Sequence, residues 1–168
     1  MIKITWKDEK VSTKLLITQV YGIVFDKTGR ILLKVENKKG KKIYSFGGGT
    51  PEEFDNGIKD TLRREMIEEL NTTLKNDIFY LGYQLIENDG ERLPYAQVRM
   101  TAMIQEINNK KPDPDNGETY DRVLVSPQKA IKLLNWGEVG KLQIEKAVKS
   151  IKENLDLIIA TDDEEIWI

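Results

Sequence analysis

Seven segments of the chain either alternate hydrophobic with polar residues or form short, mainly apolar runs. A period of two puts successive side chains on opposite faces of an extended backbone, so these segments are predicted to be β-strands. They comprise residues 2–6, 14–25, 30–35, 43–46, 78–87, 94–107 and 120–125. With helices between and after the strands, this order predicts an α/β or α+β fold.

The segment 94–107 divides its residues clearly between two faces. The apolar face carries Ala96, Val98, Met100, Ala102 and Ile104, and the polar face carries Tyr95, Gln97, Arg99 and Thr101. A polar strand face that includes an arginine either meets solvent or lines a cleft. The pattern leaves both possibilities open.

A period near 3.6 residues first occurs after the glycine run at 47–49. Ile58, Leu62, Met66 and Leu70 form an apolar ridge along one side of a predicted helix. We expect this helix to begin after an N-cap at residue 55 or 56 and to end at Leu70.

Two more helices are predicted near the C-terminus. Ser126 and Pro127 suit the N-cap and first positions of a helix. Apolar residues at helical spacing between 144 and 155 predict the last helix. The tail at 160–168 is acidic with an apolar end.

Glycine and polar clusters mark the connections. Gly29 lies between two predicted strands and suits the left-handed position of a hairpin turn. The basic segment 37–42 is expected to be an exposed loop, either merely solvated or forming a positive rim for a polyphosphate. Residues 88–90 form a predicted turn, and residues 108–117 a polar loop.

The glycine run and the helix after it carry the candidate chemistry. Three consecutive glycines, Gly47 to Gly49, allow positive φ and close approach of backbone to a ligand. At roughly 100° per residue, Glu65 and Glu69 lie on one side of the helix, at the edge of its apolar face, with Glu68 further round. Such an acidic helix often simply faces water. A hard divalent cation would instead offset the repulsion between these carboxylates.

The order of these features resembles the Nudix box, G-x5-E-x7-R-E-U-x-E-E-x-G-U, over residues 47–72. Residues 64–69, Arg-Glu-Met-Ile-Glu-Glu, fit the R-E-U-x-E-E portion at every position. The chain departs from the box at Asn56, where a glutamate is expected, as though the preceding loop had gained one residue. It departs again at Asn71 and Thr72, although Asn71 remains suited to a left-handed C-cap.

The departure at Asn56 affects Arg64, because the early glutamate typically pairs with the box arginine in this family. Glu52, Glu53 and Asp55 lie close by in the altered loop. We therefore expect Arg64 to act as a structural clamp held by one of these three acids, rather than as a metal ligand.

Resemblance to the Nudix hydrolases implies an α/β/α sandwich with a mixed β-sheet. It implies hydrolysis of a nucleoside diphosphate linked to another moiety, with Mg²⁺ or Mn²⁺ as cofactor. By resemblance, Glu65 and Glu69 are the main metal ligands, Glu68 is a third ligand or acts through water, and the Gly48 carbonyl joins them. Glu68 and Glu69 are accordingly also counted as catalytic.

Family members often supply one more glutamate from a later loop, as a general base or metal ligand. Glu118 is the first choice here, and a solvated surface acid is the alternative reading of it. Arg99 and, less directly, Lys34 are candidates for binding substrate phosphates. Several aromatic residues could contact a base, and the sequence does not choose among Tyr21, Tyr44, Phe46, Tyr83 and Tyr95.

Composition narrows the chemistry further. The chain of 168 residues contains neither Cys nor His, which excludes thiolate–zinc sites, thiol nucleophiles and Ser-His triads. Its net charge of −2 gives no general attraction to nucleic acid or anionic membranes. Without a signal peptide or long apolar run, residues 1–168 are expected to be a single cytoplasmic domain, a monomer or homodimer with no membrane contact.

Two readings of function remain. The first is a metal-dependent nucleotide pyrophosphohydrolase, whose substrate could be a small nucleotide or 5′-capped RNA. The alternative is a catalytically inactive Nudix-fold module that binds nucleotides, which the altered box keeps open. An enzyme like isopentenyl-diphosphate isomerase is disfavoured, because that type relies on cysteine and histidines.

Overall fold

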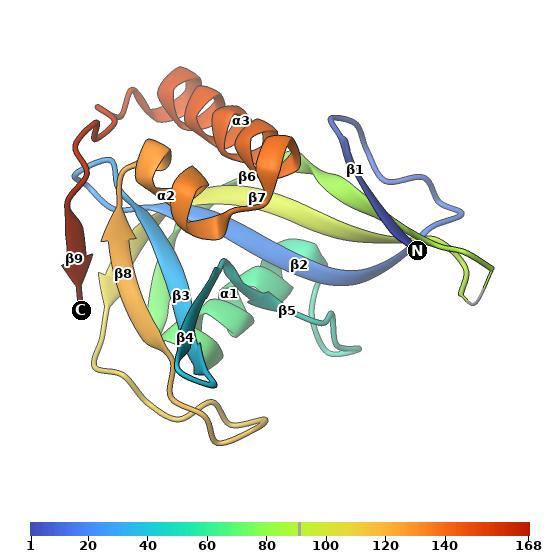
Figure 1. Ribbon diagram of the computed structural model, residues 1–168, viewed down its shortest axis with the longest axis horizontal. Helices are drawn as coiled ribbons and strands as arrows, with labels where there is room; N and C mark the ends of the chain where they lie inside the picture. Colours follow the sequence, from blue (N-terminus) through green and yellow to red (C-terminus); the bar gives the residue numbers. More distant parts are fainter. Residues whose placement is uncertain (91) are drawn as a thin grey trace.

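The computed structural model describes residues 1–90 and 92–168. Its main body is a mixed nine-stranded sheet between helices (Figure 1). The strands are β1 (Ile2–Lys7), β2 (Leu16–Phe25), β3 (Ile31–Lys38), β4 (Lys41–Ser45), β5 (Gly47–Gly49), β6 (Thr72–Asn88), β7 (Tyr95–Ile107), β8 (Asp121–Val125) and β9 (Glu165–Trp167). The helices are α1 (Ile58–Leu70), α2 (Pro127–Leu134) and α3 (Gly137–Leu155).

The sheet runs in the order β1-β6-β7-β2-β3-β8-β9, with β4 paired to β3 and β5 paired to β2. Only β2 and β7 pair in parallel, and the other pairs are antiparallel. Helix α1 covers one face, while α2 and α3 cover the other (Figure 1). The predicted α/β/α sandwich with a mixed sheet is confirmed.

All seven predicted strands are present, and the structure extends several of them. The basic segment 37–42 is not an open loop as predicted. β3 continues to Lys38 and β4 begins at Lys41, so only a tight turn at Lys39 and Gly40 separates them. Both turn residues have positive φ, which allows a two-residue hairpin turn. Its charged side chains still face outward.

β2 and β3 separate soon after their connecting turn. Gly29 has a φ of 76°, as the predicted hairpin requires, but Phe25 and Ile31 are the only residues paired between the two strands. Beyond that pair, β5 lies along β2 and β4 lies along β3. The sheet is therefore split at this point.

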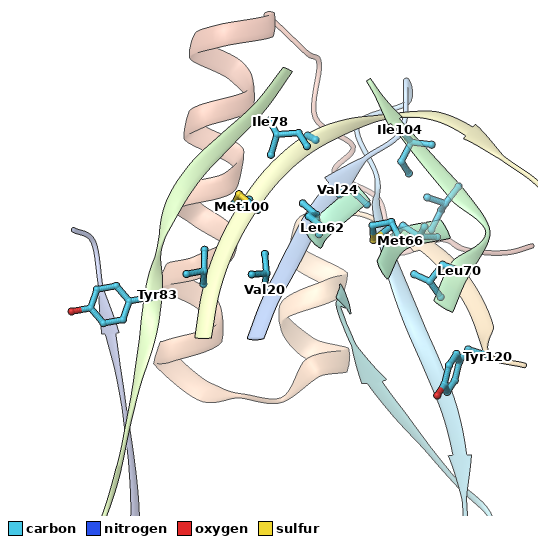
Figure 2. Packing of buried hydrophobic residues seen from close by; sticks show 14 of the residues in the cluster. Val20, Val24, Leu62, Met66, Leu70, Ile78, Tyr83, Met100, Ile104 and Tyr120 are labelled. Carbon is cyan, nitrogen blue, oxygen red and sulfur yellow. The ribbon is translucent and has the colours of Figure 1, made fainter. Parts of the chain in front are cut away.

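Helix α1 is held by its predicted apolar ridge. Leu62, Met66 and Leu70 are buried against residues of β2, β6 and β7 (Figure 2). Burial of each such side chain contributes about 1.5 to 3 kcal/mol, so this ridge fixes how the helix lies on the sheet. With the ridge against the core, the neighbouring glutamates lie along the edge of the buried face.

The start of α1 differs from the prediction. The N-cap is Gly57, without a side-chain cap, rather than residue 55 or 56. The Asp55 carboxylate instead accepts hydrogen bonds from the Thr61 hydroxyl and the Glu52 N–H. The C-terminus agrees with the sequence, because Asn71 is a left-handed cap with φ 44°.

The remaining helices close the opposite face. Ser126 caps α2 by accepting from the Lys129 N–H, and Pro127 is its first residue, as predicted. The predicted last helix is α3, which begins earlier, at Gly137. The acidic tail forms the edge strand β9, which the sequence analysis did not anticipate. No helix in the described part of the chain is long and apolar enough to span a membrane.

Candidate active site

The glycine strand β5 lies directly against the acidic side of α1. At Gly48, φ is 151°, and a Cβ there would overlap the backbone at Val20 and Tyr21. At Gly49, a Cβ would overlap the Glu65 carboxylate itself. Gly48 thus has to be glycine for β5 to lie this close to β2, whereas a larger residue at Gly49 would displace the Glu65 carboxylate.

Arg64 organises the N-terminal half of this acidic region. Its guanidinium donates to both carboxylate oxygens of Asp55, from Nε at 3.0 Å and Nη2 at 2.9 Å. Nη1 donates to Glu65 Oε1 at 2.9 Å and to Glu68 Oε2 at 3.0 Å. Nη2 also donates to the Thr50 carbonyl at 2.8 Å, which ties the loop after β5 to the helix.

The expected ion pair between Arg64 and an acid of the altered loop is therefore confirmed, with Asp55 as the partner. Hydrogen bonds from Arg64 hold the pKa of Asp55 well below its usual range. The same pair raises the pKa of Arg64, so both groups stay charged. Asp55 replaces the missing glutamate from one residue earlier in the chain.

The surroundings of Glu65 disfavour its negatively charged form. Only 7% of the residue is exposed, and burial raises its pKa to about 7, a shift that Arg64 opposes and that Glu69 and Glu68 reinforce. The single arginine thus does not fully compensate the negative charge on this side of the helix.

Glu69 lies one helical turn further on and has different partners. Lys34 Nζ on β3 donates to its Oε1 at 2.8 Å, and the Gly48 N–H donates to its Oε2 at 3.1 Å. Burial still raises the pKa of Glu69, although Lys34 opposes the shift. Lys34 was predicted to bind substrate phosphate, and its ammonium also lies 4.7 Å from the centre of the Tyr120 ring.

The predicted ligands therefore lie on one side of the helix and beside the glycine strand, but their carboxylates do not surround a common point. Within residues 1–90 and 92–168, no three acidic side chains are grouped closely enough to hold a metal ion. Their chemistry nevertheless fits Mg²⁺ or Mn²⁺, because these ions prefer carboxylate and carbonyl oxygens. The incompletely neutralised charge at Glu65 supports that fit. Arg64 occupies only one oxygen of Glu65 and one of Glu68, and no hydrogen bond within the described residues reaches Glu65 Oε2 or Glu68 Oε1.

The loop between β7 and β8 contributes two different acids. Glu118, the predicted loop glutamate, is exposed and lines a small hollow of about 260 Å³ with Glu36 and Lys38. Asp113 is buried, and its negative charge adds to the raised pKa of Glu69. The sequence does not single out Asp113, since nothing in the turn-rich segment 108–117 indicates which acid faces inward.

A cavity of about 490 Å³ includes Tyr21 of β2 and Lys34 of β3 in its lining, and Lys34 is the residue that pairs with Glu69. Lys34 and Glu36 line it on one side, and Arg99 lines its inner wall. The polar face of β7 is thus cleft-lining at Gln97 and Arg99. Among the aromatic residues that the sequence offered, Tyr21 and Phe46 are part of the lining, together with Trp136.

Arg99 is enclosed to a degree that the sequence did not suggest. Only 2% of the residue is exposed, and burial lowers its pKa to about 10. Its Nε donates to Gln143 Oε1 at 2.8 Å, its Nη2 donates to Gln84 Oε1 at 2.6 Å, and its guanidinium lies over the Tyr21 ring. Whether Arg99 also contacts a substrate phosphate stays a prediction.

Solved structures share this arrangement of strands and helices. A pyrophosphohydrolase from Bacillus subtilis superposes with a TM-score of 0.64 at 16% identity, over 88% of this chain and 90% of its own. A NUDIX hydrolase from Nitrosomonas europaea gives 0.61 at 14% identity, over 88% and 98%. The chain has the Nudix fold.

A mutator MutT protein from Bacillus halodurans is also similar, with a TM-score of 0.54 at 20% identity over 70% of this chain and 73% of its own. The sequence matches no protein-family model and no curated protein. The Nudix fold expected from residues 47–72 is confirmed by structure, at identities that carry no information about substrate.

Proposed function

We propose that this Nudix-fold chain is a divalent-cation-dependent hydrolase that cleaves a pyrophosphate bond in a nucleoside diphosphate linked to another moiety. The observation that carries the proposal is the contact between the glycine strand and the acidic side of α1. Glu65 lies against Gly49, where a Cβ would not fit, and Glu69 accepts from the Gly48 N–H.

Each residue has a role in this proposal. Glu65 and Glu69 would hold Mg²⁺ or Mn²⁺, with Glu68 and the Gly48 carbonyl as additional oxygen donors. When bound, such an ion neutralises phosphate charge and activates water for attack on phosphorus. Arg64 keeps the loop and helix in register, and Lys34 lies close enough to Glu69 to meet a phosphate that enters beside it.

Two acids of the loop between β7 and β8 are candidates for the general base. Glu118 was selected from the sequence and is exposed beside β3. Asp113 is the candidate that the structure adds, because it is buried and its charge acts on Glu69. Asp113→Asn and Glu118→Gln, compared for kcat at saturating ion, would separate the two. The acid that serves as base should give the larger loss.

A catalytically inactive nucleotide-binding module is the second candidate. It is favoured by the pairing of all three helix glutamates with Arg64 or Lys34. If those ion pairs persist in the presence of Mg²⁺ or Mn²⁺, the carboxylates would serve the structure and not catalysis. The cytoplasmic location and the monomeric or homodimeric state stay predictions.

Release of phosphate or pyrophosphate from a substrate panel tests the proposal. The panel comprises nucleoside triphosphates, nucleoside-diphosphate sugars, dinucleoside polyphosphates and 5′-capped RNA, each with Mg²⁺ and with Mn²⁺. Turnover of at least one member that disappears in EDTA is the expected result. Binding of nucleotides without turnover under any condition would favour the inactive module.

A further inference from the structure

Arg122 on β8 is a buried cation that the candidate site does not use. Only 4% of the residue is exposed, and its Nε has no hydrogen-bond partner within the described residues. Its Nη1 donates to two backbone carbonyls, those of Leu70 and Asn108, each at 2.7 Å. No carboxylate of the described chain accepts from its guanidinium, and burial lowers its pKa. Burial of a charge without a counter-charge is unfavourable, which points to a function for these two contacts.

The position of Arg122 in the sheet brings it close to the acidic side of α1. It lies directly opposite Lys34 on β3. Opposed residues in a strand pair have Cβ atoms about 4.5 to 5.5 Å apart, and like charges there repel each other. Both cations contact the last turn of α1. Lys34 donates to the Glu69 carboxylate at 2.8 Å, and Arg122 donates to the carbonyl of the next residue, Leu70. Glu69 is therefore held through its side chain by one strand and through its adjoining backbone by the next.

The end of α1 does not depend on Arg122 for its own hydrogen bonds. Asn71 is a left-handed cap whose N–H donates to carbonyls of the helix. The Leu70 carbonyl also accepts from the Thr72 hydroxyl at 3.0 Å. Local helix geometry thus accounts for the end of α1 without an arginine. It does not account for the second contact, between Arg122 and Asn108.

Asn108 is the first residue after β7, and it begins the loop that carries the candidate bases Asp113 and Glu118. The Asn108 N–H donates to the Asn71 carbonyl at 3.0 Å, which adds a second link between this loop and the end of α1. Further along, the Asp113 N–H donates to the Glu118 carbonyl, and the Gly117 N–H donates to the Asp113 carbonyl, both at 2.7 Å. These bonds close the loop on itself, so a shift of its first residue would change where both acids lie relative to α1.

We propose that Arg122 is a positioning residue that keeps Glu69 in register with the loop acids. It does so by bonding the Leu70 and Asn108 carbonyls through a single nitrogen. The inference rests on the proposed function, in which Glu69 is a metal ligand and a loop acid is the general base. Arg122 belongs to neither group, so its replacement tests their placement and leaves the set of ligands unchanged.

The test is Mn²⁺ binding and turnover in Arg122→Met, which replaces the cation with an apolar side chain. Loss of an outer partner of a metal ligand typically weakens metal affinity or activity 10- to 100-fold, so we expect the Kd for Mn²⁺ to rise about tenfold and kcat to fall by about 10- to 100-fold. The electron paramagnetic resonance signal of free Mn²⁺ gives Kd, and circular dichroism sets a temperature at which the variant is folded. A role confined to stability would lower the melting temperature and leave Kd and kcat of the folded protein unchanged.

Arg30→Met is the matched control. Arg30 is also a buried arginine whose Nε lacks a partner within the described chain, but it donates to Asp162 and Glu164 of the C-terminal tail. Its replacement should lower the melting temperature, because the tail loses an anchor, and should leave Kd and kcat at wild-type values. Arg122→Lys keeps the charge on a shorter side chain, so its Kd for Mn²⁺ should lie between those of wild type and Arg122→Met.

Wild-type Kd and kcat in folded Arg122→Met would overturn the inference, whereas a fall in kcat at unchanged Kd would support it through the placement of the base. If Arg122→Met does not fold, Arg122→Lys decides: weaker Mn²⁺ binding than wild type supports the inference, and equal binding overturns it. Weaker Mn²⁺ binding in the variants, with no hydrolysis of any panel member by wild type, would keep the positioning role at Glu69 and overturn the proposed function. Absence of Mn²⁺ binding to wild type would overturn both.

Discussion

The two faces of the sheet surround their buried charged groups with different kinds of partner. On the face covered by α1, four carboxylates, those of Asp55, Glu65, Glu68 and Glu69, share two cations, Arg64 and Lys34. On the face covered by α3, Arg99 is enclosed by amides and an aromatic ring. The first face carries more negative than positive charge, whereas the second surrounds Arg99 with neutral, directional groups.

The two faces also differ in how the burial of their charged groups affects the stability of the protein. Burial is the main cause of the raised pKa values of Glu65 and Glu69, and neighbouring carboxylates add to it, so a bound cation would favour their charged forms. Burial of the Arg99 guanidinium is unfavourable unless its hydrogen bonds to neutral oxygens are kept. The acidic face should therefore respond to metal ions.

The largest effect is expected from Glu69→Gln on turnover. Because the change removes a proposed ligand itself, kcat should fall by more than the roughly 10- to 100-fold typical for loss of an outer partner of a metal ligand. Initial rates at saturating Mg²⁺ measure it. Glu153→Gln on the exposed side of α3 is the control and should match wild type.

The same variant should also destabilise the protein. Glu69 pairs with Lys34, and each side chain is only 10% exposed. We therefore expect a measurable fall in melting temperature. Near-wild-type turnover in Glu69→Gln would show that the acidic face is not the metal site.

Metal ions should stabilise the protein through the acidic face. Binding to the native state at about 100 times Kd contributes about 2.7 kcal/mol, or roughly 5 to 10 °C for a chain of this size. Melting temperatures with millimolar Mg²⁺, Mn²⁺ or Ca²⁺ measure the shift. The double variant Glu65→Gln, Glu69→Gln should lose it. A wild-type melting temperature indifferent to all three ions would favour the inactive module.

Arg64→Ala should weaken both stability and activity without removing a ligand. Its side chain is 16% exposed and bonds three carboxylates and one carbonyl, so we expect a loss of about 1 to 3 kcal/mol in urea unfolding. Arg63→Ala is the matched control, since its ion pair with Asp60 is solvent-exposed and worth less than about 1 kcal/mol. Equal losses in the two variants would contradict the clamp role.

The smallest predicted effect is a pH dependence at Asp55. Its folded pKa lies below the usual value of 3.8, so its contribution to stability is present above about pH 3.8 and is lost as pH falls toward the folded pKa. In metal-free protein, the melting temperature of wild type should drop more steeply than that of Asp55→Asn between pH 5 and pH 3, values chosen to bracket the unfolded pKa at about 3.8. Parallel curves would exclude Asp55 as the partner that keeps Arg64 in place.

Local patterns predicted the elements of this fold well. The alternation in residues 94–107 correctly assigned Ala96 and Val98 to the core, and the ridge on α1 placed Glu65 at the edge of the buried face. These features depend on periodicity within a single element. The Asp55–Arg64 pair was also predictable as one of three choices, because the loop confines those acids near the helix.

Contacts between distant segments could not be predicted. The strand β9 forms only because the tail reaches β8, and Arg30 anchors it through Asp162 and Glu164. The alignment of Gln84 with Gln97 depends on strand register, which is irregular along β6 and β7. The burial of Asp113 likewise depends on how the loop packs, which its turn-forming residues do not specify.

The central claim is that the acidic side of α1 supports divalent-dependent cleavage of a pyrophosphate bond. Its most direct test is the initial rate of EDTA-treated protein on the best panel substrate as Mg²⁺ or Mn²⁺ is added back. The account predicts no turnover without the ion and a saturable increase with it, abolished in the double variant Glu65→Gln, Glu69→Gln. Turnover that is unchanged in EDTA, or retained by that variant, would contradict it.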